Sequence, residues 1–538
     1  MTTKLLQTVE GQARQRASEP AVIAVSDRET VLWSWGDLWE RSGRIASLLL
    51  DMDVTPGDVV AYQLPNCAEF VAISLAILRI GAVCCPLLPA FREREISFIL
   101  ERSRARVLFI LDTYRGRCPV DEIASIGPHL STLVHLIVLG SGNRSLALPE
   151  SDQLACIWLD QRIDSLKIDS DAIDARAPRD VDLAQLLFTS GTSGTPKGAL
   201  HHHETLSLAV HLSSAQLGLT HRDRIFIPSP LAHQTGFLYG MWQGLSLGAM
   251  QILLEQWEPR LALATMRKHR ATFVQAATPF LVDLLQLVES GEQPPEKLQI
   301  FVATGTAVPR TVARRATSAL GATVCGAFGT TESCLATLST PHDRPSNAWN
   351  TDGHPLPSVR IRVCDDEDNR LPPGSEGHLQ IRSLTMFKGY LDDPQATGQA
   401  YTQDGWYRTG DLAVIDAEGY LRVTGRVKDV INRGGEKIPV SDIEQLLHEH
   451  ESVREAAVVA MPDERLGERA CAFVVLHADR QLTFSDMTTF LDQQRLATPY
   501  WPERLEVVRE LPKTASGKVQ KYVLRELAKN LSPESRES

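Results

Sequence analysis

Several features of membrane, secreted and nucleic-acid-binding proteins are missing from this sequence. Its most apolar run, Phe70–Cys85, is broken by Arg79 and Gly81 and falls short of the ~20 predominantly apolar residues that span a bilayer. The N-terminal segment has no apolar signal-peptide region. The net charge of −11 disfavours nucleic acid as the main partner, because phosphate backbones bind basic surfaces. We therefore expect no membrane span, and we interpret Phe70–Cys85 as a buried helix followed by a buried strand.

Cysteine patterns typical of disulfide frameworks and zinc sites are also missing. The nine cysteines are an odd number, and no two of them form a CxxC pair. A reduced, cytoplasmic chain fits this usage best. The neighbours Cys84 and Cys85 allow a redox pair, but two core thiols are the favoured interpretation because free cysteine packs as a small hydrophobe.

The length and the local patterns predict several domains. A chain of 538 residues exceeds the ~250–300 residues of one hydrophobic core. Helix-like and strand-like segments alternate for most of the length, which indicates an α/β fold with largely parallel sheets. Around residues 350–425, short β-rich runs between turn signals indicate a small antiparallel sheet or barrel. A new α/β pattern follows, so we expect a hinge at Lys428 between a core of residues 1–427 and a C-terminal domain of residues 428–538.

A loop of glycines and hydroxyl groups, FTSGTSGTPKGAL, follows an apolar run. It is not a Walker loop, because Pro196 replaces the last glycine and Gly198 follows the lysine. Hydroxyl groups, flexible glycines and one lysine still suit an anion such as a nucleotide phosphate. A flexible surface loop is the less favoured alternative. The candidate phosphate-binding residues are Thr189, Ser190, Gly191, Thr192, Ser193, Gly194, Thr195 and Lys197.

This loop and six later motifs resemble the adenylate-forming superfamily, which includes acyl-CoA synthetases, nonribosomal peptide synthetase adenylation domains and beetle luciferases. The later motifs are PLAHQTG (Pro230–Gly236), ATGTAVP (Ala303–Pro309), AFGTTES (Ala327–Ser333), GWYRTGDL (Gly405–Leu412), GRVKDVINRGGEKI (Gly425–Ile438) and LPKTASGKVQK (Leu511–Lys521). They occur in the order typical of the superfamily. The resemblance implies a multidomain α/β fold: a large N-terminal domain of two α/β subdomains and a small β-barrel, hinged to a small α+β C-terminal domain.

The resemblance also implies a site for ATP and Mg²⁺. The opening loop would hold the β- and γ-phosphates, Thr331 the α-phosphate, and Glu332 the Mg²⁺ ion, a hard cation that prefers oxygen ligands. Phe328 would stack on adenine, although taken alone it reads more readily as a core aromatic. Around the nucleotide the resemblance adds Gly329, Thr330, Gly305, Thr306 and Ala307.

Six further positions complete the expected machinery. By resemblance, Asp411 would bind the ribose hydroxyls and Arg426 the ribose or phosphate, while Lys518 would bridge the carboxylate and the α-phosphate. Taken alone, Asp411 could cap a turn and Lys518 could be a solvated side chain. The C-terminal domain would then rotate about Lys428 so that coenzyme A enters past a glycine pair, Gly434 and Gly435.

The acid substrate would lie beside His233, an aromatic gate in this superfamily, although a lone histidine is more often structural. The motif LAHQTGFLYG has no acidic residue to hold an amine, so an amino acid substrate is not expected. Bacterial medium-chain and alicyclic acyl-CoA synthetases are the closest resemblance, with aryl-acid ligases second. The expected acyl pocket comprises Gln234, Phe237, Leu238, Met241, Thr278, Pro279, Thr304, Cys334 and Leu335.

Three functional hypotheses follow. The first is an AMP-forming acyl-CoA synthetase that uses ATP, Mg²⁺, coenzyme A and a small carboxylic acid. The second is a stand-alone acyl-AMP ligase that loads an acyl carrier protein. The third is a binding protein without catalysis, which the retained charges of Lys197, Glu332, Asp411, Arg426 and Lys518 oppose. A homodimer is one option for the oligomeric state.

Overall fold

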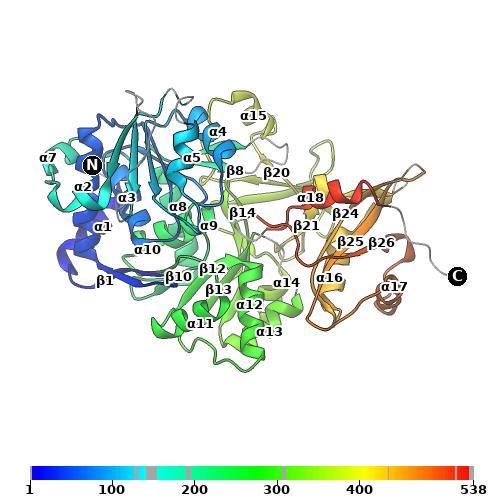
Figure 1. The fold of residues 1–538 in the computed structure, drawn as a ribbon. Helices are drawn as coiled ribbons and strands as arrows, with labels where there is room; N and C mark the ends of the chain where they lie inside the picture. The colour runs from blue at the N-terminus through cyan, green and yellow to red at the C-terminus, as the bar shows by residue number, and fades with distance from the viewer. Residues whose placement is uncertain are drawn as a thin grey trace.

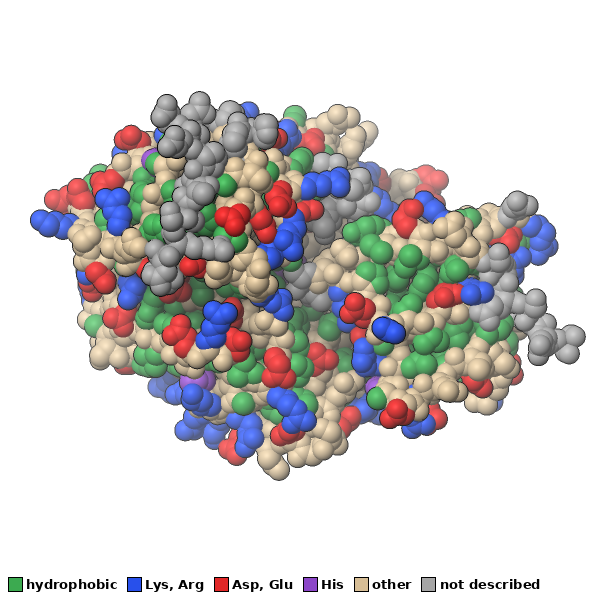
Figure 2. Space-filling model, in the orientation of Figure 1, with side chains coloured by type: hydrophobic (Ala, Val, Ile, Leu, Met, Phe, Trp, Pro, Cys, Tyr) green, Lys and Arg blue, Asp and Glu red, His purple; other side chains and the backbone are tan. Residues whose placement is uncertain are grey.

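The computed structural model describes residues 3–126, 130, 132–140, 154–189, 196–305, 310–433, 436–463, 465–514 and 518–531. Within these ranges, layered sheets covered by helices form a large body, and a smaller C-terminal unit lies on the side of the molecule opposite the N-terminus (Figure 1). No helix in the described ranges is long and apolar enough to cross a membrane. Acidic and basic side chains are intermingled over most of the face in Figure 2.

The first sheet carries the glycine–hydroxyl loop at one end of a hairpin. Among the described residues its strand order is β19-β9-β8-β4-β3-β5-β6-β7. Strands β3, β4 and β5 pair in parallel, whereas β8 and β9 pair antiparallel up to Thr189 and Lys197, on either side of the loop. The strand bounds are β3 Val59–Gln63, β4 Val83–Pro86, β5 Val107–Leu111, β6 His135–Leu139, β7 Ala155–Trp158, β8 Leu183–Thr189, β9 Lys197–His202 and β19 Gly389–Tyr390.

The second sheet supplies the adenine-motif strand. Its order in the described residues is β16-β15-β14-β13-β12-β10-β11-β1-β2, with parallel pairing from β11 to β14. Because the carboxyl ends of parallel strands meet at one edge, the motifs that follow β13 and β14 lie together. The bounds are β1 Pro20–Val25, β2 Thr30–Ser34, β10 Arg224–Ile227, β11 Met250–Leu254, β12 Phe273–Ala277, β13 Ile300–Thr304, β14 Thr323–Thr330, β15 Cys334–Leu338 and β16 His354–Pro355.

Helices cover both sheets. The helix α3 is buried on nearly every side, as its predominantly apolar sequence predicts, whereas α2 begins with a capping box between Ser34 and Asp37. The helices of the large body are α1 Lys4–Gln15, α2 Trp35–Asp51, α3 Ala68–Arg79, α4 Glu93–Ser103, α5 Pro119–Ile126, α6 Leu159–Arg162, η2 Ile163–Ser165, α7 Ser170–Asp174, α8 His203–Leu217, α9 Gln234–Gly236, η3 Phe237–Trp242, α10 Gln243–Leu247, α11 Pro259–Lys268, α12 Thr278–Glu289, α13 Arg310–Leu320, α14 Pro345–Asn350 and α15 Pro394–Gln399.

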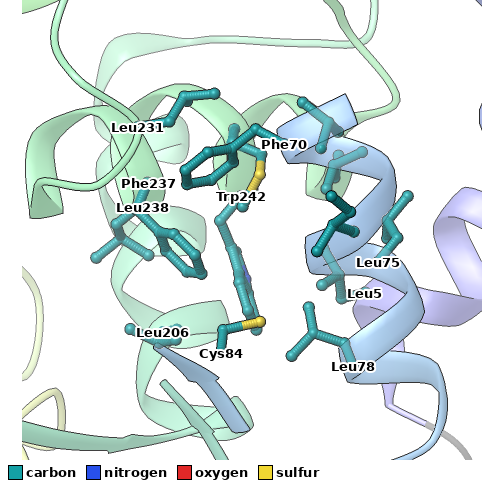
Figure 3. Packing of buried hydrophobic residues seen from close by; sticks show 14 of the residues in the cluster. Leu5, Phe70, Leu75, Leu78, Cys84, Leu206, Leu231, Phe237, Leu238 and Trp242 are labelled. Carbon is teal, nitrogen blue, oxygen red and sulfur yellow. The ribbon is translucent and has the colours of Figure 1, made fainter. Parts of the chain in front are cut away.

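The main core lies between the two sheets. Figure 3 shows Leu75 and Leu78 of α3 facing Trp242 and its neighbours across this core. Cys84 lies in the same cluster, and both it and Cys85 are buried and free. The prediction of core thiols is therefore confirmed, and so is the prediction that Phe70–Cys85 holds a helix and then a strand.

A small antiparallel sheet links the large body to the C-terminal unit. Its order is β17-β18-β20-β21, and the turn-rich region around residues 350–425 predicted such a unit. A short helical turn, η4 (Val427–Asp429), connects it to the C-terminal strands and contains Lys428. The bounds are β17 Arg360–Cys364, β18 Glu376–Arg382, β20 Tyr407–Ile415, β21 Leu421–Arg426, β22 Ile431–Arg433, β23 Glu436–Ile438, α16 Val440–Glu449, β24 Val453–Asp463, β25 Gly467–Leu476, α17 Phe484–Gln493, η5 Thr498–Tyr500, β26 Arg504–Val507 and α18 Lys521–Ala528.

Asp352, which is half-buried, joins the second sheet to the small sheet. Its carboxylate accepts a hydrogen bond from the Val423 N–H at 2.7 Å, and its own backbone N–H donates to the Leu421 carbonyl at 2.8 Å. The Thr337 hydroxyl donates to the Asp352 carbonyl at 2.6 Å. Burial is the main cause that raises the pKa of Asp352 from 3.8 to about 6.

The raised pKa of Asp352 predicts a pH-dependent contribution to stability. The folded state binds this proton more tightly than the unfolded state, so the contribution falls as the pH rises from about 4 through about 6. We expect Asp352→Asn to be more stable than the wild type near pH 7.5 by on the order of 2 kcal/mol, with a much smaller advantage near pH 4. Chemical unfolding at both pH values measures this, and an equal difference at both would contradict it.

Candidate active site

The turn between β14 and β15 presents Thr331 and Glu332. Thr330 and Ser333 close this turn reciprocally, since each backbone N–H donates to the other's hydroxyl at 3.2 Å. The Tyr239 hydroxyl accepts from the Leu335 N–H at 2.6 Å just beyond the turn. The motif AFGTTES is therefore held in place at a strand end, where the sequence predicted a nucleotide site.

Phe328 and Gly329 lie in β14, directly before this turn. Phe328 is half-buried and packs against both the main core and the small sheet, which leaves part of its ring exposed. A Cβ at Gly329 would lie 2.3 Å from the Cys334 carbonyl oxygen, so only glycine fits there. Gly305, which ends the neighbouring strand, has a positive φ of 84°. Thr306 and Ala307 lie outside the described residues.

A histidine that the motifs did not single out supports Thr331. The Nε2 atom of His201, on β9, lies 2.7 Å from the Thr331 carbonyl oxygen and must donate, since a carbonyl only accepts. Burial lowers the pKa of His201 to about 4, which keeps the imidazole neutral. The strand that starts at Lys197 is thus bonded directly to the turn that holds Thr331.

Glu332 and Lys197 lie on either side of one tyrosine. The Glu332 side chain is largely buried, and its Oε1 accepts a hydrogen bond from the Tyr390 hydroxyl at 2.8 Å. The Lys197 ammonium lies 4.9 Å from the centroid of the Tyr390 ring. At the base of the loop, the Thr189 hydroxyl donates to the Lys197 carbonyl at 3.3 Å. The loop residues Ser190, Gly191, Thr192, Ser193, Gly194 and Thr195 lie outside the described residues.

Lys518, from the C-terminal unit, reaches a buried ion pair of the large body. Asp411 is only 3% exposed, and its Oδ1 lies 3.1 Å from Arg426 Nε. Burial raises the pKa of Asp411, and both Arg426 and Lys518 lower it in part. Burial and then Arg426 lower the pKa of Lys518 to about 8, with Asp411 and Asp429 opposing the decrease. The three charges therefore influence one another although they come from separate motifs.

His233 lies in the same electrostatic surroundings as Lys518. Its Nδ1 accepts from the Thr235 N–H at 3.3 Å and so caps the short helix α9. Burial, and secondarily the charge of Lys518, lower the pKa of His233 to about 4. His233 is therefore neutral beside the lysine, which fits a gate next to a carboxylate better than a second cation.

The expected acyl-pocket residues fall into two groups. Phe237, Leu238 and Met241 lie in the π-helix η3, which is buried throughout, and Figure 3 shows Phe237 and Leu238 in the main core. Gln234, Thr278, Thr304 and Cys334 are also buried. Gln234 lies close to Cys334, whose pKa burial raises to about 12. Sequence reasoning missed the π-helix, a rare geometry that often marks functional sites.

A further glutamine, Gln275, was also missed. It lies on β12, against which α9 packs, and is as buried as Gln234. The side-chain amides of both glutamines lack a hydrogen-bond partner within the described part of the chain. The glutamine inside the apolar strand FVQAA was only a weak signal, since Gln185 in β8 and Gln251 in β11 are also buried and lack a partner within the described part of the chain.

The described residues contain no group of three or more His, Cys, Asp or Glu side chains that could hold a metal ion. A protein cage for Mg²⁺ is therefore not formed by them. Glu332 alone still fits the ion, because Mg²⁺ is commonly bound by one or two carboxylates together with substrate phosphates.

Lys428 lies in η4, where Arg525 donates to its carbonyl at 3.3 Å, while Gly434 and Gly435 lie outside the described residues.

The bond from His201 to Thr331 predicts a selective effect on ATP binding. His201→Leu leaves a buried carbonyl without its donor, so we expect a loss of about 1–3 kcal/mol of stability and roughly tenfold weaker ATP binding. His202→Leu is the matched control, because its half-buried ring makes no contact with Thr331. Thermal melting and titration calorimetry with ATP measure both quantities. Equal effects of the two variants on ATP binding would refute a specific role of His201.

Curated relatives span nearly the whole chain. A medium-chain fatty-acid–CoA ligase of Escherichia coli is 36% identical over 94% of this chain and 88% of its own length. A 2-hydroxy-7-methoxy-5-methyl-1-naphthoate–CoA ligase of Streptomyces carzinostaticus is 33% identical over 93% of this chain and 90% of its own. A 2,3-dihydroxybenzoate-AMP ligase of Bacillus subtilis is 29% identical over 92% and 88%. Most of these relatives join an acid to coenzyme A.

Solved structures share the fold and the family models cover both parts of the chain. An anthranilate CoA ligase with bound anthranoyl-AMP superimposes with a TM-score of 0.87 at 25% identity, over 98% of each chain. ATP-bound MatB from Rhodopseudomonas palustris gives 0.86 at 26% identity, over 98% and 99%. The model described as AMP-binding enzyme matches residues 9–391, and that of the AMP-binding enzyme C-terminal domain matches residues 442–518. The chain therefore belongs to the AMP-binding enzymes of the adenylate-forming superfamily and is an AMP-forming acid–thiol ligase.

Proposed function

We propose that this enzyme converts a medium-chain, alicyclic or aryl carboxylic acid, ATP and coenzyme A into an acyl-CoA, AMP and diphosphate. The observation that carries the proposal is the convergence of Lys518 on Asp411, Arg426 and His233. A non-catalytic binding protein would not need to bring a lysine from a second structural unit to the ion pair of Asp411 and Arg426. The CoA ligases among the relatives support coenzyme A as the acceptor.

In the first half-reaction a carboxylate oxygen attacks the α-phosphorus of ATP and diphosphate leaves. Both reactants are anions, so fixed positive charge must be present before they meet. The Lys518 ammonium would bond one oxygen of the carboxylate and one of the α-phosphate, and the Thr331 hydroxyl would donate to the α-phosphate as well. Neutral His233 would lie against the carboxylate without adding or removing charge.

Glu332 would hold the Mg²⁺ ion of Mg·ATP through its carboxylate. The ion would supply Lewis-acid stabilisation of the triphosphate charge when bound. Lys197 and the loop from Thr189 to Thr195 would hold the β- and γ-phosphates. The roles of Glu332 and Lys197 are supported by their positions on either side of Tyr390 at the base of this loop.

Asp411 would bind the ribose hydroxyls. Its Oδ1 pairs with Arg426, whereas its Oδ2 is buried and lacks a hydrogen-bond partner within the described part of the chain. A buried carboxylate oxygen without a donor is costly, so a ligand hydroxyl is well suited to satisfy it. Phe328 would stack on adenine, with Gly329, Thr330, Gly305, Thr306 and Ala307 shaping the walls around it.

The polarity of the side chains in the proposed acyl pocket narrows the range of carboxylic acids that would bind. Leu238, Met241 and Cys334 favour an apolar acyl group, whereas the unpartnered amides of Gln234 and Gln275 favour a substrate with a hydrogen-bonding substituent. Within the proposed range, this combination is most consistent with a substituted aryl acid. Phe237, Thr278 and Thr304 would complete the wall.

In the second half-reaction the coenzyme A thiol attacks the acyl carbonyl and AMP leaves. Lys518 must withdraw first, and the C-terminal domain, residues 428–538, would rotate about Lys428 against the core of residues 1–427. Gly434 and Gly435 would then let the pantetheine arm pass.

A carrier-protein thiol is the second candidate acceptor, favoured by the 2,3-dihydroxybenzoate-AMP ligase among the relatives. A homodimer and a cytoplasmic location remain predictions.

A panel of carboxylic acids with mass detection tests this function. Substituted aryl acids, alicyclic acids and medium-chain fatty acids are each supplied with Mg·ATP and either coenzyme A or a phosphopantetheinylated carrier protein. We expect AMP and an acyl-CoA from at least one class. Transfer to the carrier protein without transfer to coenzyme A would favour the second candidate, and failure to release diphosphate with any acid would contradict ligase activity.

Removing Lys518 should separate the two half-reactions. Lys518→Ala loses the charge that bridges the two anions, so we expect acyl-AMP formation to fall by about a hundredfold to a thousandfold, as removal of one preorganised donor costs ~10²–10³. Thioester formation from supplied acyl-AMP should fall less than about threefold. Single-turnover assays of each half-reaction measure this, and equal losses in both would rule out the rotation account.

The low pKa of Lys518 predicts a pH limit for adenylation. Only the protonated lysine can bridge the anions, so kcat/KM for acyl-AMP formation should fall as the pH rises through about 8. Lys518→Arg should be slower but should lose this decline, because arginine stays protonated. Profiles between about pH 6.5 and 9.5 test the assignment, and the same decline in both enzymes would refute it.

A further inference from the structure

Tyr390 occupies a position that the motif comparison does not assign to any step. It ends the two-residue strand β19, which pairs with β9 so that Tyr390 lies opposite Ala199. Backbone N–H groups of Lys388 and Leu391 donate to the carbonyls of Leu200 and Gly198, both at 2.8 Å. The backbone of Tyr390 is thus fixed beside the strand that begins with Lys197.

The hydroxyl of Tyr390 holds the carboxylate of Glu332. It donates to Oε1 at 2.8 Å, while the Phe387 N–H donates to the Glu332 carbonyl oxygen at 2.7 Å. The segment from Phe387 to Tyr390 therefore fixes both the side chain and the backbone of the acidic residue. The hydrogen bond from Tyr390 fixes Oε1 of Glu332, and because the carboxylate is planar this also fixes the direction in which Oε2 points.

The ring of Tyr390 holds the ammonium of Lys197. The separation of 4.9 Å between Nζ and the ring centroid lies within the ~6 Å range of a cation–π contact. Among the described residues, Lys197 and Glu332 form no ion pair with each other. Lys197 and Glu332 both contact Tyr390. If they formed an ion pair with each other, each charge would be satisfied by the other and not by a ligand.

The surroundings keep Tyr390 neutral and rigid. Burial, and secondarily Glu332, raise the pKa of the Tyr390 hydroxyl, so the group remains a donor at any physiological pH. Phe387 packs edge-on with a centroid separation of 4.9 Å, and the Tyr390 N–H donates to Thr397 Oγ1 at 2.9 Å. Tyr407 packs against Phe387 in the same cluster.

We propose that Tyr390 is a positioning residue that holds Glu332 and Lys197 apart, each aimed at a different part of Mg·ATP. Its hydroxyl presents the carboxylate to the metal ion, and its ring presents the ammonium to the terminal phosphates. The neutral phenol gives Glu332 one hydrogen bond and Lys197 one cation–π contact. Neither side chain therefore has to break an ion pair when the nucleotide binds. This inference rests on the proposed function and adds to it a residue outside the known motif roles.

Two substitutions separate the two contacts. Tyr390→Phe keeps the ring and removes the hydroxyl, whereas Tyr390→Leu removes both. The control is Tyr401→Phe, which removes a hydroxyl from the same aromatic cluster without touching the bond from Tyr390 to Glu332. The probe is α,β-methylene-ATP, titrated calorimetrically into each full-length enzyme with and without Mg²⁺, alongside the Mg²⁺ concentration for half-maximal AMP formation.

For Tyr390→Phe we expect about tenfold weaker binding with Mg²⁺ and a several-fold higher Mg²⁺ requirement, because a hydrogen bond to a charged group is lost. Without Mg²⁺ this variant should bind the analogue as the wild type does. Tyr390→Leu should bind roughly threefold more weakly even without Mg²⁺, because the contact of the ring with Lys197 is lost as well. Tyr401→Phe should stay within about twofold of the wild type in both titrations.

The outcomes distinguish this inference from the proposed function. A wild-type enzyme that neither binds the analogue nor forms AMP would overturn the function. An active wild type whose Tyr390→Phe variant shows the same Mg²⁺ dependence would overturn only the role of Tyr390. An equal loss in Tyr401→Phe would also overturn it, since the effect would then belong to the cluster as a whole. Melting temperatures of the variants establish that each is folded.

Discussion

The site depends on a lysine of the C-terminal unit that lies close to an ion pair of the large body. Asp411 pairs with Arg426 at 3.1 Å, while burial lowers the pKa of Lys518 to about 8 and raises that of Asp411. Asp411 Oδ2 has lost water without gaining a hydrogen-bond partner within the described part of the chain. A ligand that donates to this oxygen and places an anion beside Lys518 would supply what is missing with little reorganisation.

Local patterns in the sequence predicted much of the fold and the motif part of the site. The alternation of elements gave the α/β class, and the apolar run Phe70–Cys85 divides into α3 and β4 as expected. The motif at Thr331 lies at a strand end because parallel strands bring their carboxyl ends to one edge. The fold predictions succeeded because each depends on residues that are close in the chain, whereas the roles of the motif residues stay predictions.

The supporting residues could not be predicted in the same way. His201 meets Thr331 across 130 positions, and Tyr390 meets Glu332 across 58, so no spacing in the sequence announces either contact. Both pairings follow from β9, which lies between β8 and β19 and carries the phosphate-loop lysine at its start. The π-helix η3 escaped prediction for another reason: its apolar sequence fits an ordinary α-helix equally well.

In the proposed acyl pocket, selectivity for the acid would follow from two kinds of contact, apolar packing and hydrogen bonding, that differ in their energetic weight. One methylene more or less against Met241 changes binding by only ~1–3 kcal/mol, so apolar contacts alone separate similar acids poorly. A buried amide left without a partner penalises the wrong substrate more strongly, because its hydrogen bonds with water are not replaced. Gln234 and Gln275 are therefore the positions at which a substituted acid and its unsubstituted analogue differ most, and the π-helix that follows Gln234 fixes where the first of them points.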